Sequence, residues 1–250
     1  MSRHGEFEVR GRVQPGLGMY GQNSMTPRSA RSFAATALCL VLAGGAPGIS
    51  AQELSARREV VALPDGIAPP VKEQLQNEAM VVTRGTARIE FWWVRGLASK
   101  LPSASVPAWS EVPDGALLGV MRTMEPLPDI RGVPIAPGVY TLRFALQPQN
   151  GDHLGASPYR EFIVVGPAAA DADPNPVGYE AAVKLGTKTQ GRSHPATLSI
   201  DPPSSTEAAG SVITTEDGHS AIAIAVPFTS GGTQAGSLTF GLILVGRIDH

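Results

Sequence analysis

The sequence predicts a mainly β protein, an antiparallel β-sandwich of about 7–9 short strands with one short helix, preceded by a signal peptide. Three observations lead to this class. Glycine and proline make up 28 and 22 of the 250 residues, which favours many turns. Several stretches alternate apolar and polar residues with the period of a half-buried strand. Helix and strand patterns do not alternate along the chain, which argues against a parallel α/β sheet.

The segment 25–51 has the three parts of a secretory signal peptide. Two arginines form a positively charged start, residues 32–45 are uncharged and mostly apolar, and residues 49–51 fit the small-residue pattern before a cleavage point. The apolar stretch is shorter than the roughly 20 residues that a membrane span needs. We therefore predict an exported protein, periplasmic or extracellular, whose mature chain begins at Gln52 and has no integral membrane span.

The chain divides into three parts. Residues 1–24 are polar, Gly-rich and without periodicity, and we interpret them as disordered or as the product of a start codon assigned too early. The signal peptide occupies 25–51. Residues 52–250 form a single β-sandwich domain, in which the Pro/Ala-rich segment 167–195 is either a linker between smaller units or an excursion within one sandwich. We favour one domain, because the strands on either side of that segment are too few to close a stable core.

The mature chain is mildly acidic. Removing residues 1–51 takes away five arginines and two glutamates, so the formal net charge falls from −2 to −5. Such a chain lacks the basic surface that binds nucleic acid. The one cysteine, Cys39, leaves with the signal peptide, which excludes disulfides, thiol nucleophiles and cysteine metal ligands.

The first elements of the mature chain are a short strand at 59–63 and one or two helical turns within 69–79, which begins with two prolines. A clearer strand follows at 86–94, where Ile89, Phe91 and Trp93 alternate with Arg88, Glu90 and Trp92. Trp92 therefore faces away from Trp93. It is either covered, by a second sheet or by a helix at 177–191, or exposed as an anchor for a partner. Another strand is predicted at 117–124.

The central hairpin of the prediction follows the turn residues Pro137 and Gly138. Beyond them, Tyr140, Leu142, Phe144 and Leu146 fall on one face of a strand, which we assign to the core. The other face carries Val139, Thr141, Arg143 and Ala145, and we predict that it is largely solvated. Residues 160–166 are the antiparallel partner of this strand.

The C-terminal third contains a helix at 177–191 and three further strands. A strand is predicted at 196–200, and the last one at 237–246. Between them, residues 211–228 form a hairpin, because Asp217 and Gly218 are typical of a two-residue turn with positive φ angles.

The segment GVPIAPGVYTL (132–142) has the pattern G-x-x-I-x-x-G-x-Y-x-L. It resembles a hairpin of a bacterial exported β-sandwich family of unknown function. The resemblance covers about a dozen residues and the upstream TARIEF strand. It implies a packing motif within a small β-sandwich, and it brings no catalytic residues with it.

The longest predicted loop, 148–161, is the first candidate for a binding site, because long ordered loops often carry binding residues. Asp152, His153, Tyr159 and Arg160 supply a mixed polar set there. The alternative is an elaborate turn in which these side chains bind local backbone or solvent.

Metal binding is the second hypothesis. His153, His194 and His219 could share a site with Asp152, because loops at one end of a sandwich converge. The alternative is a set of unrelated surface histidines, since no two of them have the spacing of a local claw. No catalytic constellation is recognisable, and we predict no cofactor. The sequence thus favours a non-enzymatic binding or structural accessory module with a protein or small-ligand partner. The alternative is a metal- or small-ligand-binding protein that uses the 148–161 loop. This alternative includes a hydrolytic protein.

Overall fold

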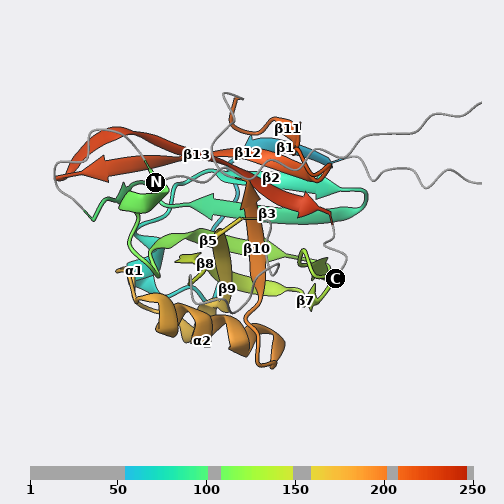
Figure 1. Cartoon of the computed structure of the whole chain (residues 1–250), viewed down its shortest axis with the longest axis horizontal. Helices are drawn as coiled ribbons and strands as arrows, with labels where there is room; N and C mark the ends of the chain where they lie inside the picture. The colour runs from blue at the N-terminus through green and yellow to red at the C-terminus, as the bar shows by residue number, and fades with distance from the viewer. Residues whose placement is uncertain (1–53, 101–107, 149–158, 202–207, 247–250) are drawn as a thin grey trace, which may run out of the picture. The chain divides into compact units, whose positions relative to one another are not determined.

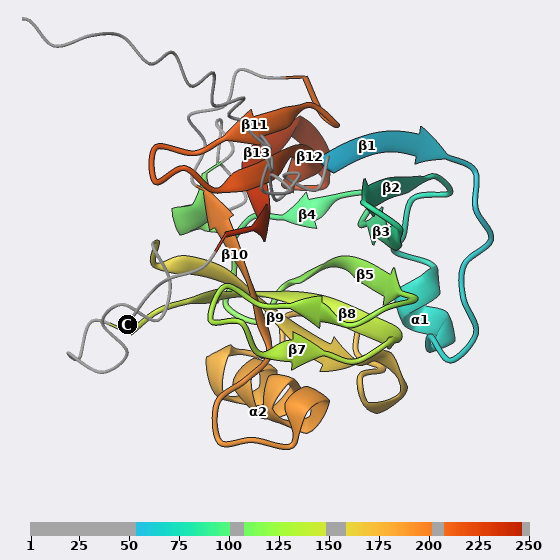
Figure 2. The ribbon, with the colours of Figure 1, turned by 90° about the vertical axis from the view of Figure 1, so that its right-hand side faces the viewer.

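A computed structural model describes residues 54–100, 108–148, 159–201 and 208–246. Most of them lie in β-strands (Figures 1 and 2). The main strands are β1 (Leu54–Glu59), β2 (Ala79–Arg84), β3 (Ala87–Trp93), β5 (Leu117–Thr123), β8 (Gly138–Leu146), β9 (Glu161–Pro167), β10 (Thr197–Asp201), β11 (Val212–Thr214), β12 (Ser220–Ser230) and β13 (Thr233–Val245). The remaining elements are α1 (Pro69–Lys72), β4 (Leu97–Ala98), η1 (Trp109–Glu111), β6 (Leu127–Pro128), β7 (Pro134–Ile135), η2 (Ala168–Ala170) and α2 (Tyr179–Gln190).

The ten main strands follow one continuous antiparallel path, in the order β1-β2-β3-β5-β8-β9-β10-β13-β12-β11. β4 pairs in parallel with β12, and β6 and β7 form a separate ribbon. The sheet is curled, because β1 at one edge contacts β11 and β12 at the other. The mainly β, antiparallel class is therefore confirmed. A sandwich of about 7–9 strands is not confirmed, because one hydrogen-bonded path joins ten strands.

The inner face of the curl is filled by apolar side chains. Tyr140, Leu142 and Phe144 are buried there, as the alternation in β8 predicts. An aromatic cluster joins β3, β8, β13 and η1. Its ring centroids are 5.0–5.7 Å apart, and its members are Phe91, Trp93, Trp109, Phe144 and Phe240. Such stacked and edge-on pairs stabilise a core beyond their buried area.

The outer face of β8 corrects the sequence interpretation. Thr141, Arg143 and Ala145 are at most 1% exposed, so the prediction of a largely solvated face is wrong. The physical reason is that the chain after β9 returns across this face. Both views show α2 beside β9 (Figures 1 and 2), and α2 also contacts β8. Ala145, Phe162, Val164 and Ala182 form a second apolar cluster between sheet and helix.

Arg143 holds the returning segment in place. Its Nε and Nη2 donate to the two carboxylate oxygens of Asp171 at 2.6 and 2.7 Å, and the hydroxyl of Thr141 donates to the same carboxylate at 2.6 Å. The guanidinium also donates to three backbone oxygens, those of Gly115, Asp173 and Asn175. A buried ion pair is stable only when its remaining donors and acceptors are satisfied in this way. The chain from Asp171 to Asn175 is thus attached to the sheet.

Helix α2 approaches the sheet through small residues. Ala182 and Gly186 are its buried positions, whereas Ala181 is exposed. A Cβ atom at position 186 would lie 2.6 Å from Cβ of Pro195 and 2.6 Å from Cγ1 of Val164. Neither helix in the described part of the chain has the length and apolar character of a membrane span.

Several element boundaries differ from the sequence prediction. The first strand is β1 at Leu54–Glu59 rather than 59–63, and β2 at Ala79–Arg84 was missed, because it lies between the predicted helical turns and the strand predicted at 86–94. The hairpin of β11 and β12 is confirmed, but its loop has three residues, because the amide of Thr215 donates to the carbonyl of His219 at 2.8 Å. Gly218 is the last residue of this longer turn and has a φ of +78°.

Replacing Arg143 should destabilise the protein strongly. In Arg143→Met, Asp171 stays buried without its partner, and we expect the free energy of unfolding to fall by about 3–5 kcal/mol. Adding Asp171→Asn removes the stranded charge and should recover part of that loss. Chemical denaturation would measure both, with the exposed Arg192→Met as control, expected to change stability by less than about 0.5 kcal/mol. A loss below about 1 kcal/mol in Arg143→Met would contradict the structural role of the pair.

Gly186→Ala tests the close approach of α2. Alanine favours a helix interior over glycine by about 1 kcal/mol. We nevertheless expect a net loss of stability, since overpacking costs about 1–3 kcal/mol and the neighbouring Pro195 ring cannot rotate away. At the exposed Ala181, the reverse change Ala181→Gly should cost only the propensity difference. Thermal unfolding of the two variants decides the point, and a more stable Gly186→Ala protein would show that the helix does not pack as described.

Candidate functional site

The predicted 148–161 loop lies mostly outside the described residues, and Asp152 and His153 are among those not described. Arg160 is exposed, at the entrance to β9. Its carbonyl accepts a hydrogen bond from the amide of Gln147 at 2.8 Å, and its Nη2 donates to the carbonyl of Gln147 at 3.1 Å. The base of the loop is therefore closed by ladder-like bonds that continue the β8–β9 pairing.

Tyr159 has the most perturbed environment of the predicted site residues. Burial, a hydrogen bond with Asp201 and the negative charges of Asp201, Asp217 and Glu216 raise the pKa of Tyr159 to about 12. The charges of Asp217 and Glu216 come from the turn between β11 and β12. The base of the 148–161 loop thus lies within electrostatic reach of that turn.

The two predicted metal ligands that the structure describes lie in different connections of the fold. His194 lies in the exposed connection between α2 and β10, whereas His219 is half-buried at the start of β12. The amide of His219 donates to the hydroxyl of Thr215 at 3.1 Å, and its Nδ1 is buried without a hydrogen-bond partner in the described part of the chain. Within residues 54–246, gaps excepted, no three His, Cys, Asp or Glu side chains are placed to hold a metal ion. A site that includes His153 stays a prediction.

Trp92 is fully buried, so the alternative in which it is exposed as an anchor for a partner is wrong. In the described part of the chain, its polar contacts come from the residues after β1 and from β5. The indole N–H of Trp92 donates to the carbonyl of Val61 at 3.3 Å, and the guanidinium of Arg122 lies 5.5 Å from the ring centroid. The chain after β1 and a cation–π contact therefore close this part of the outer face.

Charged side chains on the same face form a structural ladder. The carboxylate of Glu90 is almost inaccessible and accepts hydrogen bonds from Arg88 at 2.9 Å and Arg122 at 2.5 Å. Arg88 also donates to Glu59 at 2.8 Å, which ties β3 to β1 across β2. The Arg88 and Arg57 guanidiniums hold the pKa of Glu59 below its usual value, with the bond from Arg88 the largest cause. These charges stabilise the sheet edge and leave no carboxylate free for acid–base work at this position.

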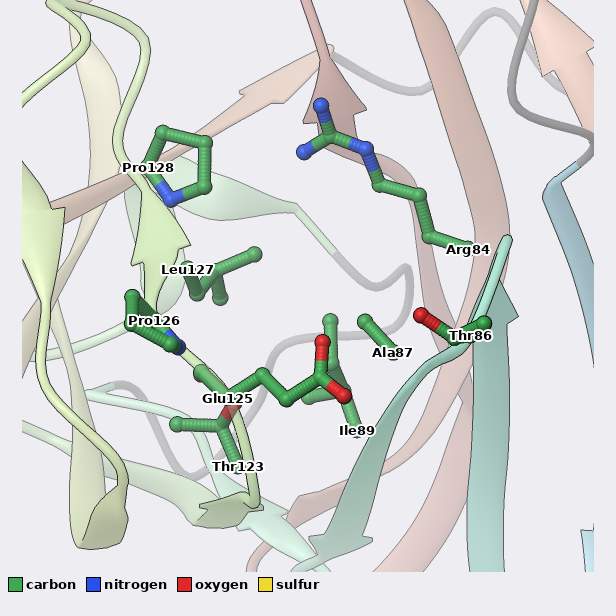
Figure 3. Close-up of a pocket in the computed structure, with 9 residues that line it drawn as sticks. All are labelled: Arg84, Thr86, Ala87, Ile89, Thr123, Glu125, Pro126, Leu127 and Pro128. Atoms are coloured by element: carbon green, nitrogen blue, oxygen red, sulfur yellow. The ribbon is translucent and has the colours of Figure 1, made fainter.

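A cavity of about 180 Å³ lies at one end of the curl (Figure 3). The β2–β3 turn, the end of β5 and the connection to β6 border it, and it is open to solvent on one side. Its lining residues are Arg84, Thr86, Ala87, Ile89, Thr123, Glu125, Pro126, Leu127 and Pro128. Ile89 and Leu127 are buried and make its apolar lining. In Figure 3 the guanidinium of Arg84 and the carboxylate of Glu125 lie on opposite sides of the Leu127 side chain.

Two hydrogen bonds shape this cavity. Nη1 of Arg84 donates to the carbonyl of Leu244 at 3.2 Å, which connects β2 with β13 across the end of the curl. The hydroxyl of Thr123 donates to the carbonyl of Glu125 at 2.5 Å and fixes the turn after β5. The sequence interpretation missed both charged residues of this cavity. The available signal was the alternation of Met80, Val82 and Arg84, which places a cation on the inward face at the end of a strand.

A second cavity of about 180 Å³ has a different character. Its walls are apolar or uncharged: Gln74, Val94, Gly96, Leu97, Ala98, Ala116, Leu117, Pro174, Asn175 and Pro176. The two cavities therefore have similar volumes, but only the one at Arg84 and Glu125 is flanked by opposite charges.

No protein-family model, curated protein or solved structure matches this chain. The resemblance of residues 132–142 to an exported β-sandwich family is untested by these comparisons and stays a prediction.

The environment of Tyr159 can be measured by ultraviolet titration of phenolate formation. Because the folded protein favours the protonated phenol, stability contributed by this group is present below its ordinary pKa of 10.0 and is lost as the pH rises toward about 12. Tyr159→Phe should lose one phenol that titrates near pH 12. Asp201→Asn removes a hydrogen-bonded anion and should move that midpoint toward 10. An unchanged midpoint in Asp201→Asn would contradict the described contact.

Proposed function

We propose that this chain is an exported, non-enzymatic binding or structural accessory module. The observation that carries the proposal is the use of its buried ionic groups. In the described part of the chain, each of them hydrogen-bonds to protein groups that hold secondary structure together, and these residues are Glu90, Asp129, Arg143 and Asp171. Catalytic acids and bases need to face a cleft in which substrate can reach them. Because these ionic groups stabilise the fold, they support the proposal of a scaffold whose function is binding.

Asp129 illustrates this use of charge. Its carboxylate accepts hydrogen bonds from the amides of Arg131 and Val133, at 3.0 and 2.8 Å, and from the guanidinium of Arg131. Arg131 in turn donates to the carbonyl of Pro195 at 2.9 Å. The β6–β7 turn is thereby fastened to the chain that precedes β10.

Export is supported by the order of a positively charged start, an apolar stretch and small residues over residues 25–51. The mature module would contain no cysteine, which suits an oxidising compartment because its core does not depend on thiol chemistry.

The second candidate function is binding of a metal ion or small ligand at the 148–161 loop. The specific observation in its favour is the environment of Tyr159, which brings the base of that loop near the turn that precedes His219. His153, Asp152 and one of His194 or His219 would supply the remaining groups.

Export predicts a defined N-terminus. Intact-mass measurement and N-terminal sequencing of the chain recovered from the periplasmic or extracellular fraction should give Gln52 as the first residue. A mature chain that begins before residue 40, or a chain confined to the cytoplasm, would contradict export.

The binding role predicts a partner. Cross-linking of the exported fraction should connect the exposed Lys184 and Lys188 to a recurrent partner. Turnover of ester or amide substrates by the purified chain would argue against a non-enzymatic module.

Metal titration separates the two candidate functions. A metal that binds only the folded chain at a hundred times its Kd adds about 2.7 kcal/mol to stability. The module proposal predicts an unchanged melting temperature with Zn²⁺ or Cu²⁺. The loop-site alternative predicts a rise that His153→Ala abolishes and that one of His194→Ala and His219→Ala also abolishes. A rise that survives all three substitutions would contradict the loop site as well.

A further inference from the structure

Helix α2 carries cations that have no carboxylate partner. Lys184 and Lys188 are exposed one helical turn apart, so they lie side by side on the outer face, and Arg192 is exposed just beyond the helix. Within the described residues none of the three forms an ion pair, whereas most arginines of the sheet do. Glu180 is the one acidic residue of the helix. The outer face of α2 is therefore a positively charged surface.

The stability of the helix does not account for this charge. Cations in the last turn interact favourably with the helix dipole, but the effect is lost beyond that turn. Lys188 lies in the last turn, whereas Lys184 lies one turn earlier. The contact of α2 with the sheet does not involve them either, because the buried positions of the helix are Ala182 and Gly186. The lysines are consequently available to a partner.

A surface of opposite charge lies away from α2. Figures 1 and 2 both show β11 and α2 at opposite ends of the described domain. The turn that follows β11 carries Glu216 and Asp217, which are exposed and form no ion pair with another described residue. Their charges and that of Asp201 act together on Tyr159, which shows that the three carboxylates are close in space.

The two surfaces match in spacing. The Cβ atoms of Lys184 and Lys188 are about 5–6 Å apart, as for any pair of residues four apart in a helix. Glu216 and Asp217 are consecutive, with Cα atoms about 3.8 Å apart, and the long lysine side chains can close the difference. Each surface also offers an exposed apolar group, since Val212 in β11 is 47% exposed and Ala181 on α2 is exposed.

We propose that α2 docks on the turn between β11 and β12 of a second copy of this chain. Lys184 and Lys188 contact Glu216 and Asp217 of the partner subunit. Because the two surfaces are different and lie at opposite ends, the contact is heterologous and continues from copy to copy. This inference deepens the proposed structural accessory role and rests on it.

Sedimentation velocity of the mature chain tests the association. We expect the average mass to rise with protein concentration at low ionic strength. The association should weaken at high salt, because the screening length falls from about 10 Å at 0.1 M to about 3 Å at 1 M. A chain that stays monomeric at millimolar concentration in low salt would overturn the inference. Association that salt leaves unchanged would overturn it too, since it would not depend on these charges.

Charge reversal identifies the two surfaces. One variant combines Lys184→Glu with Lys188→Glu, and the other combines Glu216→Lys with Asp217→Lys. Each variant alone presents two surfaces of the same sign and should be monomeric. A mixture of the two should associate again, because each acidic surface then meets a basic one. Self-association of either variant alone, or a mixture that remains monomeric, would overturn the assignment.

Matched controls reverse the same number of charges elsewhere. Lys72→Glu with Lys100→Glu, and Asp65→Lys with Glu73→Lys, should associate as the unaltered chain does. Loss of association in these controls would overturn the assignment, because net charge alone would then explain the result.

A milder variant removes the α2 charges without reversing them. Lys184→Gln with Lys188→Gln should weaken the association about fivefold or more. Because both positions are exposed, the substitutions should leave the fold intact, which circular dichroism checks. Unchanged association in this variant would contradict the role of the two lysines.

Failure of this inference is distinguishable from failure of the proposed function. If the purified chain is monomeric while Lys184 cross-links to a different protein in the exported fraction, the docking of a second copy is overturned and the binding role stands. If the chain is not exported, the proposed function fails whatever its state of association.

Discussion

The outer layer of this protein depends on one buried ion pair, that of Arg143 and Asp171. Taking two charges out of water costs several kcal/mol for each ion. The cost is offset because the guanidinium and the carboxylate are both fully engaged, with donors and acceptors drawn from β8, from the chain after η2 and from the turn before β5. The pair therefore fixes the path of residues 171–176. The amide of Val177 then meets the carbonyl of Gly115 at 3.3 Å, which sets where α2 begins.

The two faces of the sheet are stabilised by different physical means. The inner face is held by dispersion and hydrophobic burial, with the aromatic rings of four elements in mutual contact. The outer face is held by ionic groups placed where loops cross it, at Glu90, Asp129 and Arg143. Most charges buried in the described residues thus serve the architecture. At the end of the curl, Arg84 and Glu125 both border a cavity.

The alternation of apolar and polar residues predicted most of the strands and the residues of the inner face. Alternation in β8 identified Tyr140, Leu142 and Phe144 as core, and that assignment is confirmed. It could not reveal the burial of Arg143, because an arginine on an alternating strand is normally solvated and its partner lies 28 residues away. Nor could periodicity find the contact face of α2, since Ala182 and Gly186 are too small to register as hydrophobic. The predicted loop site rests largely on residues that are not described. The cavity could not be predicted from the sequence, because it forms only where the fold brings β2 and the β5–β6 connection together.

The two ends of the sheet path, β1 and β11, contact each other but are joined by no ladder of hydrogen bonds in the described part of the chain. An open strand edge of this kind is a template for another chain, and aggregation starts from such edges. At β1 the danger is countered by sequence, because Arg57, Arg58 and Glu59 are consecutive charged residues at the open edge. An incoming strand would have to strip water from them. The curled sheet can therefore keep its two edges unpaired without nucleating fibrils.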